Sequence, residues 1–210
     1  MSDDVMKRDL EFRDSKALEK WLKTRPREVA VIIAARAALR ALPVAARELP
    51  AKDVERLCAL ISALFRASAL VRVAAKYPTR GGRFPFNFAF PAATAVRIAN
   101  TSPNAAADAF HTAALALTYV YNAYVVKYAS VAVDQAGHFE DADNWRALSK
   151  DASFLSAGGA VAELADRPLW PDAVPPLAAE IWARLKAGLP TGEDWDVWIR
   201  WYDERLRCTS

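Results

Sequence analysis

The sequence predicts an all-α protein, a multi-helix bundle of about seven to eight helices around a long central helix, with one aromatic-rich extended loop. Three observations lead to this prediction. Apolar residues recur every three to four positions over long stretches, which is the spacing of one helix face. Alanine, the strongest helix former, supplies much of the 53% hydrophobic content. Only 7 glycines but 12 prolines interrupt the chain, so prolines mark most of the expected helix ends.

Two helices are expected near the N-terminus. Ser15–Lys23 has its apolar side chains on one face. Pro26 suits the first turn of the next helix, where backbone N–H groups have no helical partner. We expect that helix to end at about Leu42, because Pro43 lacks the N–H that would continue the hydrogen-bond pattern.

Arginines accompany the apolar stripes of these first helices. Arg36 and Arg40 lie beside or on the stripe of the second helix, so each must pair with a carboxylate or reach water. Two interpretations stay open, a structural ion-pair role and an anion-binding pocket between helices. The full set is Arg36, Arg40, Arg47, Arg56 and Arg66, with Glu48, Asp53, Glu55 and Asp108 as candidate partners.

A third helix, from Pro50 to about Tyr77, has the clearest amphipathic pattern in the chain. The pattern stops at residues 78–91, PTRGGRFPFNFAFP, where phenylalanines occupy every second position. In an extended segment such residues lie on one side, and Pro85 excludes an ordinary central strand. We therefore expect an extended aromatic loop that lies across the helices.

The long central helix is expected between Pro103 and Gln135, with a length of about 50 Å. Residues 112–133 within it contain one charged residue, Lys127. Tyrosines and Asn122 lie near the middle of this stretch, whereas the aromatic residues of membrane helices prefer the interfaces. We therefore interpret it as a buried helix and expect no membrane association.

Residues 167–210 form an expected tryptophan-rich C-terminal helical subregion. A helix over about Asp143–Ser156 precedes it and ends at two glycines. A proline-rich turn over 167–176 leads into a helix at Pro176–Gly188, and a final helix spans about Asp194–Arg207.

Five segments of the chain are distinctive in sequence. They are PREVAVIIAARAALRALP at 26–43, WRALSKDASFLSAG at 145–158, PLWP at 168–171, WARLKAGL at 182–189 and DWDVWIRWYDERLR at 194–207. Together they resemble an uncharacterised family of Ala- and Trp-rich helical proteins from bacteria. The resemblance implies a helical fold and a bacterial origin. It implies no catalytic role, because the family has no established activity, and it leaves open whether the native protein continues beyond Ser210.

The composition predicts a single helical domain over residues 1–210. The net charge of +3 comes from interspersed acidic and basic residues, which permits an acidic partner without arguing for one. Cys58 and Cys208 form no disulfide framework, and the charged N-terminus lacks the apolar core of a signal peptide. We therefore expect a cytoplasmic protein with a flexible arm over residues 1–14.

No catalytic, metal or cofactor site is predicted. The imidazole and thiol groups are those of His111, His138, Cys58 and Cys208, which lack the spacing of metal ligands. No nucleophile elbow or phosphate-binding glycine loop occurs in the sequence. An enzyme of unrecognised type, with His111 as the first residue to test, is the third alternative for function.

The final helix has the strongest interaction signal. Trp195, Trp198 and Tyr202 share the face that we expect in the core, while Trp201 lies at its edge and Val197 lies opposite. Tryptophan and tyrosine are common anchors of protein interfaces. Our leading hypothesis is therefore a helical module that mediates protein–protein contact, by self-association or by docking to a larger partner.

The aromatic loop provides a second candidate surface. Arg80, Arg83, Phe84 and Phe86 adjoin one another, and arginine with exposed aromatic rings can hold single-stranded nucleic acid by charge and stacking. A nucleic-acid-binding accessory protein is therefore the second hypothesis. It competes with a simpler arrangement in which the phenylalanines pack on the core and the arginines face water.

Overall fold

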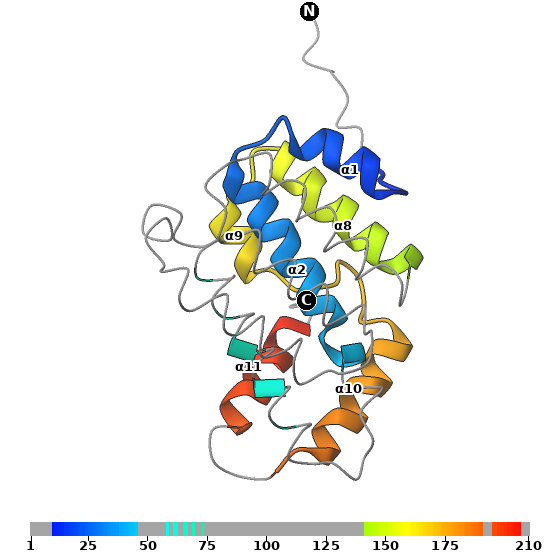
Figure 1. The fold of residues 1–210 in the computed structure, drawn as a ribbon, viewed down its shortest axis with the longest axis vertical. Helices are drawn as coiled ribbons and strands as arrows, with labels where there is room; N and C mark the ends of the chain where they lie inside the picture. Colours follow the sequence, from blue (N-terminus) through cyan, green and yellow to red (C-terminus); the bar gives the residue numbers. More distant parts are fainter. Residues whose placement is uncertain are drawn as a thin grey trace, which may run out of the picture.

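The computed structural model describes residues 10–45, 141–190 and 195–206, together with seven helical positions between 58 and 73. This described part is all-helical, as predicted, and contains no strand. Its helices are α1 (Ser15–Leu22), α2 (Arg27–Ala45), α8 (Asp141–Ser156), α9 (Val161–Asp166), α10 (Pro176–Gly188) and α11 (Trp195–Leu206) (Figure 1). The predicted aromatic loop at 78–91 and the long central helix at 103–135 lie outside the described residues.

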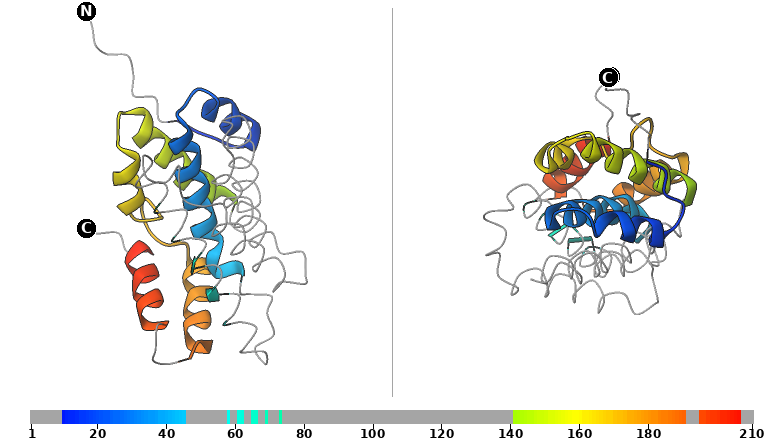
Figure 2. Two further views of the ribbon diagram at one scale, coloured as in Figure 1. Left: turned by 60° about the vertical axis from the view of Figure 1, so that its left-hand side comes forward. Right: turned by 90° about the horizontal axis from the view of Figure 1, so that it is seen from above.

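Helix α2 occupies the centre of the described part. It contacts α8, α9 and α10, and Figure 2 shows α8 and α9 together on one side of it. Every residue from Val29 to Pro43 is buried, which explains why this helix is apolar nearly all round. Among the described helices, none combines the length and the apolar character needed to cross a membrane.

Pro43 corrects one of our boundary predictions, because it lies inside α2 and the helix continues to Ala45. A proline at this position has no N–H to donate to the carbonyl of Leu39, four residues earlier. That carbonyl instead accepts a hydrogen bond of 2.8 Å from the hydroxyl of Tyr202 on α11. A side chain from the far end of the chain therefore replaces the backbone donor that proline lacks.

Other helix ends follow local signals in the sequence. Asp14 caps α1 by accepting a hydrogen bond of 2.7 Å from the backbone N–H of Ala17. Gly158, just beyond α8, has a φ of +92°, a conformation that L side chains rarely adopt. Pro176 begins α10 as predicted. The predicted helices at 15–23, 143–156, 176–188 and 194–207 agree with the observed ones to within two residues, whereas α9 was not predicted.

Helices α10 and α11 lie side by side (Figure 2) and are joined by polar side-chain contacts. The indole Nε1 of Trp182 donates to Asp203 Oδ1 at 2.6 Å, and Lys186 forms an ion pair with the same carboxylate at 3.1 Å. The buried ring of Phe65 also packs on α11 and stacks on Trp198 with centroids 5.3 Å apart. These contacts bury one face of α11 in the core.

Candidate functional site

Two arginines of α2 share one buried carboxylate. Nε of Arg36 lies 2.8 Å and Nη2 of Arg40 lies 2.6 Å from the same oxygen, Oδ2 of Asp151 on α8. All three side chains are at most 7% exposed. Residues four apart in a helix lie on one face, which is why α2 can present both guanidinium groups to one partner. We call these three residues the arginine cluster.

Several further guanidinium N–H groups of the arginine cluster bind backbone carbonyls. Arg36 donates from its two terminal nitrogens at 2.5–2.9 Å, and Arg40 donates to one carbonyl at 2.8 and 2.6 Å. The acceptors belong to the end of α9 and the turn that follows it, namely Leu164, Arg167 and Pro168 for Arg36, and Leu169 for Arg40. Positive charge at these carbonyls also suits the negative end of a helix.

The arginine cluster is short of one negative charge, since two cations face one carboxylate. Burial lowers the pKa of Arg40 most strongly, while the charge of Asp151 opposes that shift. Nη1 of Arg40 is buried and has no hydrogen-bond partner in the described part of the structure. Because its groups are closed to solvent and tied to backbone carbonyls, the arginine cluster holds α8, α9 and the 167–169 turn on α2. This fits the structural ion-pair role, with Asp151 in place of the partners named from the sequence.

The predicted interface residues of α11 divide between core and surface. Tyr202 is buried, whereas Trp195, Trp198 and Trp201 are half-buried. Trp201 meets the ring of Phe65 edge-on, with centroids 6.2 Å apart. Val197 is 53% exposed, the highest value among the large apolar side chains of the described residues.

The residues proposed for nucleic-acid binding, Arg80, Arg83, Phe84 and Phe86, lie outside the described residues, as do His111 and His138. Among the residues that are described, no group of three or more His, Cys, Asp and Glu side chains is placed to hold a metal ion. Cys58 is a half-buried free thiol, and desolvation raises its pKa, which leaves it less reactive as a nucleophile.

A hollow that the sequence did not predict lies between α8 and the segment Leu10–Arg13, which we call the strap. The strap belongs to the stretch that we expected to be a flexible arm, yet two backbone N–H groups fix it to α8. Leu10 donates to Ser153 Oγ and Phe12 donates to Ser149 Oγ, both at 2.9 Å. Phe12 is buried and its ring lies 5.7 Å from that of Trp21 on α1.

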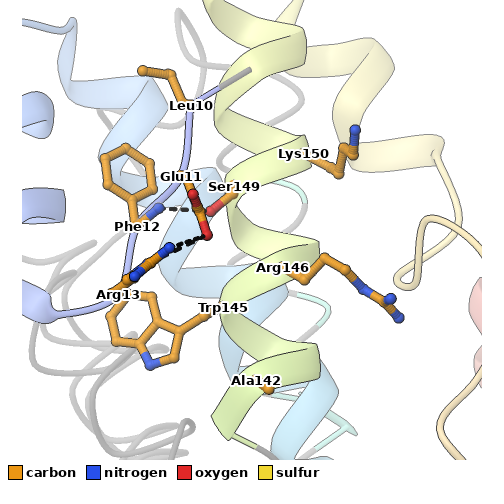
Figure 3. Close-up of a pocket in the computed structure, with 9 residues that line it drawn as sticks. All are labelled: Leu10, Glu11, Phe12, Arg13, Ala142, Trp145, Arg146, Ser149 and Lys150. Atoms are coloured by element: carbon orange, nitrogen blue, oxygen red, sulfur yellow. Dashed lines mark hydrogen bonds and ion pairs between the residues drawn. The ribbon is translucent and has the colours of Figure 1, made fainter. Parts of the chain in front are cut away.

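The hollow has a volume of about 660 Å³, and both apolar and charged residues line it. Figure 3 shows Glu11 and Arg13 on the strap side, and Arg146 and Lys150 on the other side of α8. Glu11 accepts two hydrogen bonds from Arg13, at 3.0 and 3.3 Å. We call this hollow the strap groove; its lining residues are Leu10, Glu11, Phe12, Arg13, Ala142, Trp145, Arg146, Ser149 and Lys150.

Comparison of the chain with protein-family models, with curated proteins and with solved structures gives no match. The resemblance to an Ala- and Trp-rich bacterial family therefore stays a prediction, and function must be argued from the surfaces of the molecule itself.

Proposed function

We propose that this chain is a helical protein-interaction module that self-associates through the outer face of α11. The observation that supports the proposal is the 53% exposure of Val197 on a helix whose opposite face is committed to the core. Single exposed apolar residues are common on monomers, so the exposure of Val197 supports the proposal together with the charges around it. The charges around Val197 provide the second reason.

The outer face of α11 has charges that complement a second copy of itself. Asp196 and Arg200 are exposed and stand four residues apart on one side of the helix, next to Val197. In the part of the chain that the structure describes, neither side chain has an ion-pair partner. When two α11 helices pack antiparallel about a two-fold axis near Val197, Asp196 of each copy meets Arg200 of the other. Such complementarity fixes the register of an interface.

The test is the concentration dependence of the mass of the full chain, measured by analytical ultracentrifugation. We expect Val197→Glu to raise the dimer dissociation constant at least about tenfold, since it places a charge at the centre of the contact. Leu177→Glu is the matched control, because Leu177 is a 40% exposed apolar residue on a different helix, α10. It should leave the dissociation constant unchanged.

A charge exchange tests the antiparallel arrangement itself. Asp196→Arg and Arg200→Asp should each weaken the dimer, since each places like charges opposite one another across the axis, and the double variant should restore it. A wild-type chain that stays monomeric at all concentrations would refute self-association. A double variant weaker than both single variants would refute the proposed pairing.

A further inference from the structure

We propose that the outer face of α1 binds the phosphate backbone of a nucleic-acid duplex through three exposed lysines. These residues are Lys16, Lys20 and Lys23, and we call them the lysine face. The inference does not depend on self-association, because α1 and α11 lie at opposite ends of the described part (Figure 1, Figure 2). The lysine face is also distinct from the aromatic loop at 78–91, which lies outside the described residues.

Helix geometry brings the three lysines together on the side of α1 that is turned away from the core. They are spaced four and three residues apart, so they line one face of the helix, and Lys23 at its end keeps helical dihedral angles. Leu18 and Leu22, on the opposite face, are fully buried. Since these leucines fix the rotation of α1 about its axis, the lysine face is directed toward solvent.

The protein itself neutralises only part of the lysine face. Lys23 pairs with Glu19 at 2.8 Å. Within the described ranges, Lys16 and Lys20 have no ion-pair partner. Like charges four residues apart destabilise a helix by about 0.2–0.5 kcal/mol, so this pair of lysines costs stability without a structural return. A negatively charged partner would turn this repulsion into a gain on binding.

The net positive charge of the whole chain is concentrated around this helix. Residues 16–28 contain five lysines and arginines and two glutamates, a net charge of +3, which equals that of the whole chain. The remaining residues are therefore neutral in sum. Arg25, just beyond α1, stacks over the ring of Trp21 and has no carboxylate partner among the described residues. Its charge adds to the positive potential that attracts a polyanion to this end of the molecule.

The make-up of the lysine face favours a nucleic acid over a protein or a membrane. No large apolar side chain of α1 is exposed, whereas protein interfaces use apolar and aromatic anchors and contain few lysines at their centre. A helix that lies on a membrane inserts its apolar face into lipid, but that face of α1 is buried in the core. Contacts to phosphates require charge and reach alone.

The length of the lysine face suits a run of phosphates. Lys16 and Lys23 stand about 10 Å apart along the helix axis, at 1.5 Å per residue. One strand of a DNA duplex advances about 3.4 Å per phosphate, so the lysine face spans about three phosphates. Lysine side chains are long and flexible, and they meet phosphates as point charges. Phosphate contacts carry no sequence information, so we expect binding without base preference.

Fluorescence anisotropy of a labelled DNA duplex of random sequence, titrated with the full chain, tests the proposal. We expect saturable binding at about 50 mM salt that weakens as salt rises, with a slope of about −2.7 in log K against log salt for three contacts. Lys20→Gln removes one contact and should make this slope shallower by about 0.9. Absence of saturable binding up to about 1 mM chain at low salt would overturn the proposal.

A charge-reversal pair separates the lysine face from overall charge. Lys20→Glu should weaken duplex binding by about tenfold or more. Arg184→Glu is the matched control, since it changes the net charge equally at an exposed position of α10, at the other end of the described part. Equal weakening by the two variants would overturn the proposal.

Two competitors test the kind of partner. Unlabelled duplex should displace the labelled duplex, while polyglutamate and phosphatidylserine vesicles at the same concentration of charge should displace much less of it. Polyglutamate that competes as well as the duplex would show that an acidic protein fits the lysine face equally well, and vesicles that do so would show that a membrane does. Either result would overturn the assignment to nucleic acid.

Discussion

The arginine cluster and the strap groove use the same ion pair, guanidinium with carboxylate, in opposite surroundings. The cluster side chains are at most 7% exposed, whereas Glu11 and Arg13 are 71% and 81% exposed. Removing one partner of a buried pair leaves an uncompensated charge in the interior, but an exposed pair contributes little. The comparison teaches that one interaction type can fix the fold where it is buried and contribute little to stability where it is exposed.

The largest effect is expected at the shared carboxylate of the arginine cluster. Asp151→Asn keeps the size of the side chain but leaves two buried guanidinium groups without a counter-charge. We expect the free energy of unfolding to fall by about 3–5 kcal/mol, measured by urea denaturation.

The matched control is Asp143→Asn, which removes the carboxylate of an exposed pair with Arg146. Its effect should stay within about 1 kcal/mol. Equal destabilisation by the two variants would mean that burial does not separate the two kinds of pair, and the comparison would fail.

A smaller effect is expected where α11 meets α2. Burial raises the pKa of the Tyr202 phenol, so its hydroxyl remains a donor to the Leu39 carbonyl in alkaline solution. Tyr202→Phe leaves this buried carbonyl without a donor, because Pro43 offers none. The loss of stability should be about 1–3 kcal/mol in urea denaturation.

A double-mutant cycle sharpens this prediction. Pro43→Ala supplies a backbone N–H that can bond to the Leu39 carbonyl within the continuing helix. Tyr202→Phe should therefore destabilise the Pro43→Ala chain less than the wild type, with a coupling energy of about 0.5 kcal/mol or more. Additive effects of the two substitutions would show that the tyrosine does not compensate for the proline.

The smallest effect is expected at the wall of the strap groove. Ser149→Ala removes the acceptor for the Phe12 N–H, and the loss of stability should be about 1 kcal/mol. Hydrogen exchange at the Phe12 amide should accelerate, since its protection depends on that bond. Ser156→Ala, at an exposed serine of the same helix that contacts Arg25, should leave this exchange rate unchanged. An unaltered rate in Ser149→Ala would show that the serine does not hold the strap.

Local chemistry allowed much of the fold to be predicted. The cap at Asp14, the glycine after α8 and the proline that begins α10 act on their nearest neighbours, so they can be recognised in the sequence alone. The predicted helix end before Pro43 was wrong for the opposite reason. Whether a proline ends a helix depends on what satisfies the carbonyl four residues earlier, and here that group, Tyr202, comes from far along the chain.

The candidate sites were harder to predict because they join distant segments. The apolar stripe around Arg36 and Arg40 indicated that both need partners, but nothing local distinguishes Asp151 from other carboxylates. The strap consists of four residues, too few for a periodic pattern to reveal that Leu10 and Phe12 face the core. Val197 was predicted to lie opposite the core face of its helix because that depends on helix geometry alone.

The hydrogen bond between Tyr202 and Leu39 spans 163 positions of the sequence, and the bond from Arg40 to Asp151 spans 111. A ribosome makes α2 before α8 and α11, so this helix emerges with two arginines and an unsatisfied carbonyl whose partners have not yet been synthesised. Water must solvate these groups until the later helices emerge, and α2 cannot reach its buried position before then. Closure of the core around α2 must therefore wait for α8 and α11, and until then the nascent chain exposes a helix that is apolar nearly all round.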